Sequence, residues 1–379
     1  MIKRIIASVL VLTSLAFVGC GNTTSNDKSG ENKKADFKIG IVTPTLSVAE
    51  DEFRAGENMK KKYPDMVEHV TLPENFSTEI ETAISQITNF ANDESIKAIV
   101  VVSGQSGLLP ALQKVKEQRP DIITITAPIW DDPELMSQYI DINLDTNWAE
   151  RGRTIVELAK SMGSKTFIHY SFPTHLAKES VSKRKDMMEA TCKALGMEFV
   201  EIVTPDPQTG NGPTAMQQFL SEDIPRQIEK YGPETNIFGS NCGMYEVILS
   251  KALELKYTVA EQCCPTPTQA YPTVMNLEIE EADITNFDKI NDMISEKAKE
   301  KGMDGRLGGW PIPASIFLPE YAVELAKYII DNGKTAGDVL NVEFLNKFAK
   351  DTFDVEVDFA PLKEGSKNYF MFIMDQIVY

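Results

Sequence analysis

The chain has few of the residues that form most catalytic and metal sites. Its 379 residues include three histidines, and no two cysteines are spaced as Cys-x-x-Cys. His169 and His175 have no cysteine near them in the sequence, which is poor spacing for a shared metal ion. The Gly-x-Ser-x-Gly nucleophile elbow and the Gly-x-x-x-x-Gly-Lys-Ser/Thr phosphate loop are both absent. We therefore predict that the protein is not an enzyme and has no metal site and no cofactor.

Positive charge is also scarce. The sequence has 38 lysines and arginines against 56 aspartates and glutamates, a formal net charge of −18 at pH 7. A body this acidic is repelled by the phosphates of nucleic acids and by anionic lipid headgroups. We expect no nucleic-acid partner.

An apolar run near the N-terminus, residues 5–18, is too short to cross a bilayer as a stable helix. Lys3 and Arg4 precede it and Cys20 follows it, which is the layout of a secretory signal. The segment Phe17-Val18-Gly19-Cys20 resembles the bacterial lipobox, with Phe17 in place of the usual leucine. We predict a lipoprotein signal peptide at 1–19 and an acyl chain such as palmitate on Cys20. An ordinary secretory signal with an incidental cysteine is the alternative.

The next stretch contains no large apolar side chain, so residues 20–36 are predicted to be the lipidated cysteine and a flexible tether. Such an anchor would hold the body on the extracytoplasmic face of the cell membrane without a transmembrane helix. The remaining cysteines are expected to be free or buried thiols, because a disulfide between adjacent residues would be strained. These cysteines are Cys192, Cys242, Cys263 and Cys264.

From residue 37 onward, short apolar runs alternate with amphipathic helical stretches, a rhythm typical of βαβ units with parallel sheets. Strands are predicted at 37–42, 97–102, 122–127 and 138–143, and a second set follows at 166–170, 198–204 and 236–239. The fold class is therefore α/β, with two lobes, each a parallel sheet with helices on both faces, and a central ligand cleft. We assign 37–146 and 311–335 to lobe 1, and 147–310 and 336–379 to lobe 2. The chain should cross between them near Asp145, Trp310 and Gly333.

Ligands of open α/β sheets bind outside the carboxyl ends of the strands, which places the candidate residues in the strand exits. Hydroxyl and amide groups there could contact a polar solute, although turn and cap chemistry would explain them equally well. Trp130 and Trp310 could each form a flat ligand wall or plug the hinge between the lobes. The candidates from this reasoning are Thr43, Thr45, Ser47, Ser103, Gln105, Ser106, Trp130, Tyr170, Phe172 and Trp310.

Four segments of the chain are typical of one superfamily: KIGIVTP, KAIVVVSGQSG, ESVSKRKDMMEATCKALGMEFVEIV and NIFGSNCGMYEVILSKALEL. They resemble the corresponding segments of the type I periplasmic binding proteins, the superfamily of ribose-binding and related solute receptors. More narrowly, the chain resembles an uncharacterised clostridial-type lipoprotein family, the domain of unknown function 3798. The resemblance implies that Arg184 is a ligand-facing arginine and that Asn241 belongs to an Asn-Asp pair, with Cys242 replacing the aspartate. Arg184 could instead pair with Glu179 or Glu189 on its own helix.

These features together predict a lipid-anchored solute-binding protein that captures a small polar solute, sugar- or nucleoside-like, between two lobes. Its expected partners are that solute, the membrane lipid through Cys20, and the permease of an ABC-type importer. Two alternatives remain open: a ligand-sensing lipoprotein that docks to a membrane signalling receptor, and a surface enzyme that uses the same cleft.

Overall fold

The computed structural model describes residues 36–76, 78–103, 105–207 and 212–379. The predicted signal peptide, Cys20 and nearly all of the predicted tether lie outside these residues. Among the described helices, none is both long enough and apolar enough to cross a membrane.

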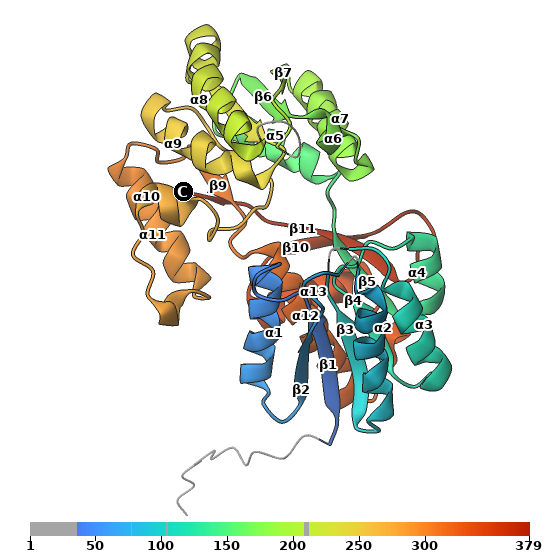
Figure 1. Cartoon of the computed structure of the whole chain (residues 1–379). Coiled ribbons are helices and arrows are strands. Elements are labelled where there is room, and N and C mark those ends of the chain that lie inside the picture. The colour runs from blue at the N-terminus through green and yellow to red at the C-terminus, as the bar shows by residue number, and fades with distance from the viewer. Residues whose placement is uncertain (1–35, 77, 104, 208–211) are drawn as a thin grey trace, which may run out of the picture. The chain divides into compact units, whose positions relative to one another are not determined.

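Lobe 1 is built on a seven-stranded sheet with the order β10-β11-β5-β4-β3-β1-β2 (Figure 1). Its strands are parallel except for β10, which pairs antiparallel to β11. The central strand β3 is almost wholly apolar because helices cover both faces of the sheet. The strands are β1 (Lys38–Thr43), β2 (Val67–Thr71), β3 (Ile96–Val101), β4 (Ile123–Thr126), β5 (Ile142–Thr146), β10 (Val357–Pro361) and β11 (Tyr369–Met374).

Two apolar cores lie on the two faces of this sheet, one beneath α12 and α13 and the other beneath α2 and α3. Helix α2 shows why they form: its buried residues Ala83, Ile84 and Ile87 recur at helical spacing. The helices are α1 (Glu50–Lys62), α2 (Ile80–Asn89), α3 (Leu109–Gln118), α4 (Pro133–Tyr139), α12 (Ala314–Asp331) and α13 (Val342–Phe353), with short 3-10 turns η1 (Phe90–Asn92) and η4 (Ala336–Asp338).

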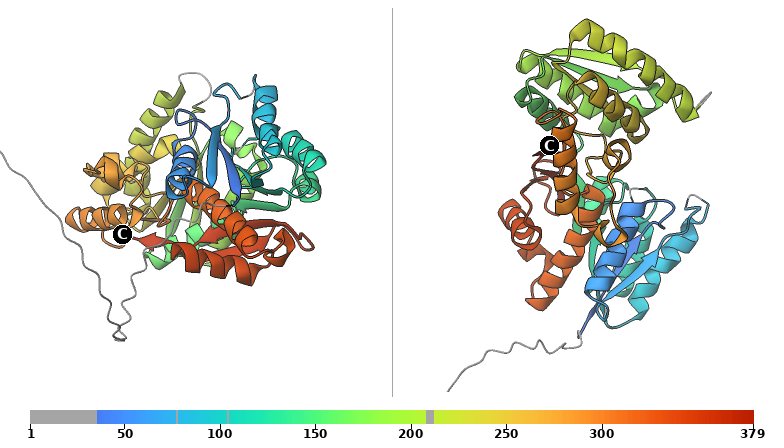
Figure 2. Two further views of the ribbon diagram at one scale, coloured as in Figure 1. Left: turned by 90° about the horizontal axis from the view of Figure 1, so that it is seen from below. Right: turned by 90° about the vertical axis from the view of Figure 1, so that its left-hand side faces the viewer.

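Lobe 2 has a smaller parallel sheet with the order β7-β6-β8 and its own apolar core (Figure 2). The strands are β6 (Thr166–Ser171), β7 (Glu198–Val203) and β8 (Thr235–Gly239), and β9 (Gly308–Gly309) pairs antiparallel with β12 (Ile377–Val378). The helical elements are α5 (Arg151–Ser161), α6 (Pro173–Leu176), α7 (Glu179–Ala194), α8 (Gly212–Tyr231), η2 (Cys242–Met244), α9 (Tyr245–Leu255), α10 (Tyr271–Met275), η3 (Glu281–Asp283) and α11 (Phe287–Glu300).

The predicted fold class of two α/β lobes is confirmed, but one predicted boundary is wrong. Residues 336–374 belong to lobe 1 rather than lobe 2, because β11 pairs with β5 and α13 packs on β10. Aromatic packing secures the tail there: Phe372 lies 5.2 Å from Phe317 of α12 between ring centroids, and Phe359 lies 5.4 Å from Tyr321. The third crossing therefore follows β11, near residues 375–376, and does not occur near Gly333.

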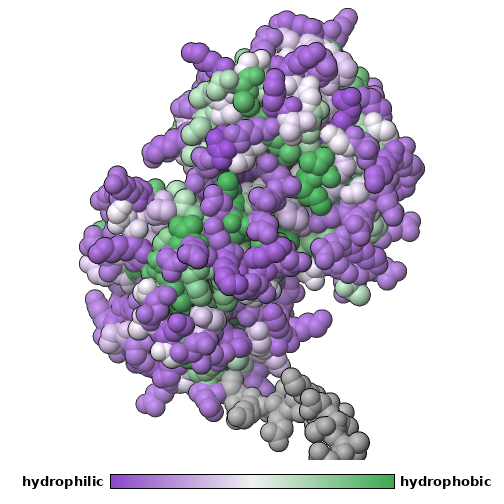
Figure 3. Space-filling view, turned by 180° about the vertical axis from the view of Figure 1, so that it is seen from behind, coloured by the Kyte–Doolittle hydropathy of each residue, from purple (hydrophilic) through white to green (hydrophobic). Residues whose placement is uncertain are grey.

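The outer surface agrees with the acidic composition. On the face drawn in Figure 3, hydrophilic residues predominate, and hydrophobic residues lie in separate patches.

Candidate functional site

A cavity of about 820 Å³ is lined by residues of both lobes. Its volume lies within the usual range for small-molecule sites. The lobe 1 wall consists of the start of α1, the exits of β3, β4 and β5, and the start of α12, so it lies at the carboxyl ends of the parallel strands. The lobe 2 wall comes mainly from the loop that precedes α10. The polar and aromatic residues of the lining include Asp51, Glu52, Ser103, Trp130, Asp145, Trp148, Cys264 and Gln269.

Trp130 presents the most exposed indole of the cavity, with 53% of the residue accessible. The loop after β3 holds its backbone: the Trp130 amide donates to the carbonyl of Gln105 at 2.9 Å, and the Ser106 hydroxyl donates to the Trp130 carbonyl. The Asp131 carboxylate then accepts hydrogen bonds of 2.7 to 3.0 Å from three consecutive backbone amides, residues 107–109, at the start of α3. A rigid backbone therefore supports an indole that is open to the cavity.

Trp148 is a second, half-buried indole at the cavity, in the chain crossing that follows β5. Its side chain donates a hydrogen bond to the carboxylate of Asp145. The Arg151 guanidinium lies 5.1 Å from its ring centroid, within cation–π range. The indole is thus fixed between a carboxylate and a cation.

Carboxyl groups of lobe 1 give the cavity an unusual electrostatic character. Burial raises the pKa of Asp145 to about 7, although the hydrogen bonds from the Thr146 amide and the Trp148 indole oppose the change. Burial also raises the pKa of Glu52 to about 7 and moves the pKa of Asp51 upward. Near neutral pH the carboxyl groups of Glu52 and Asp145 can both accept and donate hydrogen bonds, as a hydroxyl-bearing solute requires.

The structure brings few of the predicted site residues to the cavity. Ser103 and Trp130 line it, and Gln105 and Ser106 support Trp130 from the adjacent loop. Thr43, Thr45 and Ser47 do not line it: Thr43 is buried and shares a hydrogen bond of 2.8 Å with His69, while Thr45 and Ser47 bond to each other. The predicted contacts from these three residues are therefore wrong, and Val48, Ala49 and the first residues of α1 line the cavity instead.

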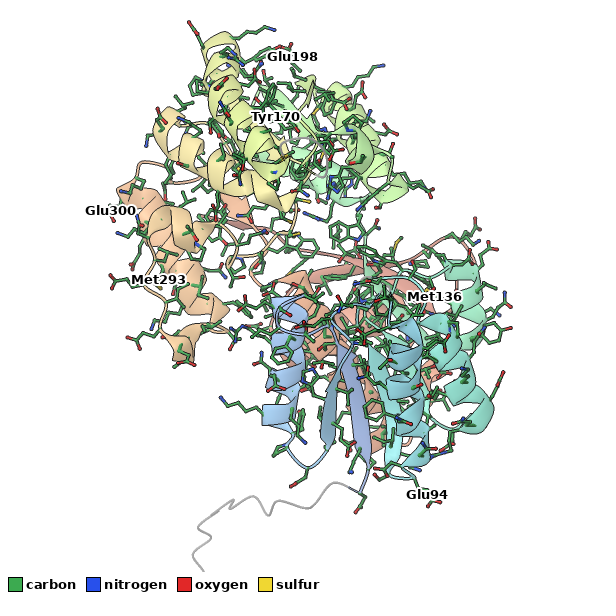
Figure 4. The ribbon with its side chains drawn as sticks, viewed as in Figure 1. Glu94, Met136, Tyr170, Glu198, Met293 and Glu300 are labelled. Carbon is green, nitrogen blue, oxygen red and sulfur yellow. The ribbon has the colours of Figure 1, made fainter. Side chains whose placement is uncertain are left out.

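The predicted solute contacts from Tyr170 and Phe172 of lobe 2 are also wrong. Tyr170 and Phe172 are buried in the lobe 2 core, where Figure 4 shows Tyr170 among the elements of that lobe. The Tyr170 hydroxyl donates to Asp223 at 2.9 Å, and Phe172 stacks on His175. The physical reason is that β6 is the central strand of its sheet, so every residue along it is buried.

Arg184, Asn241 and Trp310 likewise lie outside the cavity lining. The Asn241 side chain accepts the Gly243 amide at 2.9 Å, which caps η2. Arg184 is buried and contacts neither Glu179 nor Glu189; its guanidinium donates to the sulfur of Cys263 at 3.7 Å. The ligand-facing role that the family resemblance implied for Arg184 does not fit this position.

Trp310 forms part of a buried hub at the crossings, as the hinge alternative anticipated. Its indole donates to the carboxylate of Glu261 at 3.1 Å. The same carboxylate accepts from Arg151 at 2.8 and 2.5 Å and from Gln376 at 2.6 Å. Arg151, Trp310 and Gln376 each follow or lie in one of the three crossings, so one buried glutamate connects all three.

Sequence reasoning missed two features of this region. Asp145 and Trp148 follow the predicted strand 138–143 directly, so a carboxylate and the third tryptophan at a strand exit could have indicated them. The second feature is a cluster formed by the adjacent Cys263 and Cys264 with the more distant Cys242. Their sulfur atoms lie within 4.8 Å of one another. No sequence spacing signalled that cluster.

Comparison with known proteins places the chain in a family. Residues 37–308 match the family described as "Protein of unknown function (DUF3798)". The crystal structure of a protein from Clostridium difficile 630, described as a "Putative transcriptional regulator", is similar to this chain. The two sequences are 46% identical, and the structures superpose with a TM-score of 0.88 over 91% of this chain and 99% of that one. An uncharacterized protein of Treponema pallidum (strain Nichols) is 32% identical over 50% of this chain and 89% of its own length.

More distant structures include the periplasmic solute-binding protein of an ABC transporter from Actinobacillus succinogenes 130z with bound D-allose. It is 14% identical with a TM-score of 0.49, covering 79% of this chain and 93% of that one. The family match spans more than two thirds of the chain. The chain belongs to the protein family of unknown function DUF3798.

Proposed function

We propose that this protein is a solute-binding protein that captures a small polar solute, sugar- or nucleoside-like, in the cavity between its lobes. The observation that carries the proposal is the open indole of Trp130 in a cavity that also contains Trp148 and the carboxyl groups of Asp51, Glu52 and Asp145. No catalytic role is proposed for these residues.

The chemistry of this lining suits such a solute. The face of an indole packs against the apolar face of a sugar ring or against a nucleobase. Carboxyl groups and the hydroxyls of Ser103 and Thr268 supply hydrogen bonds around the edge of the solute. A mostly apolar cavity with a small number of placed polar groups is the usual composition of a selective small-molecule site.

Capture would proceed by a shift of population towards a closed form. A solute that contacts both walls favours the arrangement in which both sets of contacts are made at once. Rotation about the three crossings would change the distance between the walls, and the Glu261 hub would act as the pivot. Under this proposal the hub governs closure and the indoles govern affinity.

We also propose the cellular setting. The lipobox-like Phe17-Val18-Gly19-Cys20 segment supports a lipid anchor at Cys20 on the extracytoplasmic face of the cell membrane. The natural partner of an anchored solute-binding protein is the permease of an ABC-type importer. A nucleic-acid partner is not proposed, because 56 acidic residues oppose 38 basic ones.

The experiment is a thermal-shift screen of the full chain against sugars, nucleosides and small polar acids, followed by calorimetric titration of any hit. Trp130→Ala should weaken binding by about 2 kcal/mol, roughly thirty-fold, as truncation of a packed aromatic anchor commonly does. Tyr139→Ala is the matched control, because Tyr139 is an exposed aromatic residue of lobe 1 that does not line the cavity. Equal affinity in Trp130→Ala and Tyr139→Ala would contradict the proposed site.

A further inference from the structure

Three cysteine side chains meet at the lobe 2 wall of the cavity, and we propose that they form a binding site for one thiophilic divalent metal ion such as Zn²⁺. The sulfur atoms of Cys242, Cys263 and Cys264 all lie within 4.8 Å of one another. Thiolate sulfur is the preferred ligand of this class of ion. The cluster belongs to lobe 2, whereas Trp130, Asp51, Glu52 and Asp145 line the cavity from lobe 1.

The fold delivers these residues from two neighbouring segments. Cys242 begins η2 directly after β8, and the Asn241 cap fixes its backbone. The segment that leads to Cys263 runs alongside β8, where Thr258 bridges Asn236 and the Asn236 side chain accepts the Ala260 amide at 2.8 Å. The carbonyl groups of Gln262 and Cys263 are then held by Arg151 at 2.8 and 2.9 Å. The cluster therefore rests on fixed backbone rather than on a free loop.

The distances suit a shared ion. Zinc–sulfur bonds of about 2.3 Å place the sulfurs of a tetrahedral site roughly 3.8 Å apart. Cys242 and Cys264 are 2.7 Å apart between sulfurs, and no pair in the cluster exceeds 4.8 Å, so small side-chain rotations would reach that spacing. The Cys263 thiol donates to the Ser240 carbonyl at 2.9 Å, and metal binding would release this proton.

Arg184 places a buried cation beside the cluster. It is 2% exposed, and within the described residues its guanidinium has one hydrogen-bond acceptor, the sulfur of Cys263, while its Nε has no hydrogen-bond partner. The rings of Phe238 and Trp148 lie 5.1 and 5.9 Å from the guanidinium, but they are neutral and supply no counter-charge. A buried charge without a counter-charge is destabilising, so this position favours negative charge on the cluster. Three thiolates, one guanidinium and one divalent ion sum to zero, whereas a monovalent ion would leave one negative charge.

The fourth coordination position would face the cavity. Cys264 and Gln269 both line the cavity, and the Gln269 side chain hydrogen-bonds Cys242. The Oε1 atom of Gln269 is buried and has no hydrogen-bond partner among the residues described. Three protein ligands and an open position allow a water molecule, this amide oxygen or a donor atom of a bound molecule to complete the shell.

The test is a titration of the reduced, chelator-stripped full chain with Cd²⁺ as an optical probe, followed by Zn²⁺ and elemental analysis after gel filtration. The wild-type chain should take up one ion per chain, with thiolate-to-metal charge-transfer absorption. Cys264→Ser should weaken uptake by about 100-fold or more, since even the outer partners of metal ligands commonly contribute 10- to 100-fold. Cys264 is partly exposed, so this variant should fold, and circular dichroism checks that it does.

Cys192→Ser is the control, because Cys192 is buried in the lobe 2 core outside the cluster, where burial raises the pKa of its thiol to about 12. It should bind as the wild type does. Uptake that is absent from the reduced wild-type chain, or that persists unchanged in a Cys242→Ser/Cys264→Ser double variant, would overturn the proposal. Because the readout is metal stoichiometry, the result is independent of whether the cavity binds the proposed solute.

Discussion

The buried Glu261 hub makes a strong prediction about stability. The side chains of Glu261 and Arg151 are both fully buried, and Glu261 accepts four hydrogen bonds from Arg151, Trp310 and Gln376. Glu261→Gln keeps the volume but removes the charge and places an amide donor where a carboxylate oxygen accepts. The Arg151 guanidinium would then be a buried cation without a counter-charge. Breaking such a pair costs about 3–5 kcal/mol of the free energy of unfolding.

Urea unfolding followed by tryptophan fluorescence measures this loss. Glu234→Gln is the matched control, because the Lys165–Glu234 pair is similarly short, 2.6 Å, but largely exposed, and such pairs contribute less than about 1 kcal/mol. Adding Arg151→Met to Glu261→Gln should restore part of the lost stability, since no charge is then left unpaired. A Glu261→Gln variant within about 1 kcal/mol of the wild type would refute the reasoning.

Three further predictions concern the cavity, a helix contact and the anchor. The Asp145→Asn variant should be more stable than the wild type above pH 7, by up to roughly 4 kcal/mol, because a carboxyl whose pKa rises from 3.8 to about 7 destabilises the fold in its charged form. The gain should shrink as the pH falls from 7 to 4, and equal gains in unfolding free energy at pH 8 and pH 4 would contradict this. The Gly152→Ala variant should lose about 1–3 kcal/mol of the free energy of unfolding, because a Cβ there would lie 2.4 Å from the backbone oxygen of Arg184. Gly337→Ala is the control, since a Cβ fits at that position, and thermal unfolding should show almost no change in its stability. The Cys20→Ser variant should be absent from the membrane fraction, or should keep its signal peptide, when cells are fractionated. A variant that fractionates and matures like the wild type would rule out the lipid anchor.

Local sequence patterns predict most of the two sets of βα units, but they miss β2, and the strand predicted at 138–143 begins only at Ile142, after α4. The apolar run at β3 and the helical spacing in α2 follow from residues that are neighbours in sequence. The tail was assigned to the wrong lobe because its position depends on a long-range pairing, in which Tyr369 lies opposite Asn143. Alternating apolar residues in β10 and β11 predict strands but do not say which sheet they join.

For the candidate site, too, local patterns predict some residues, and the others depend on long-range contacts. Ser103 and Trp130 could be placed at strand exits by topology alone, and they line the cavity. Tyr170 could not be placed, since an aromatic residue at the end of a strand can face a cavity or a core, and only the assembled sheet decides. The cysteine cluster depends on contact between β8 and a segment more than twenty residues further along the chain, which no spacing rule encodes.

The central claim is that the cavity holds a small polar solute against Trp130. The most direct measurement is mass spectrometry of the small molecules released when the purified full chain is denatured, compared between the wild type and Trp130→Ala. We predict that the wild type releases a polar compound of sugar or nucleoside size, at up to one molecule per chain, and that Trp130→Ala releases markedly less of it. Release of the same compound in equal amount from folded Trp130→Ala would contradict the account.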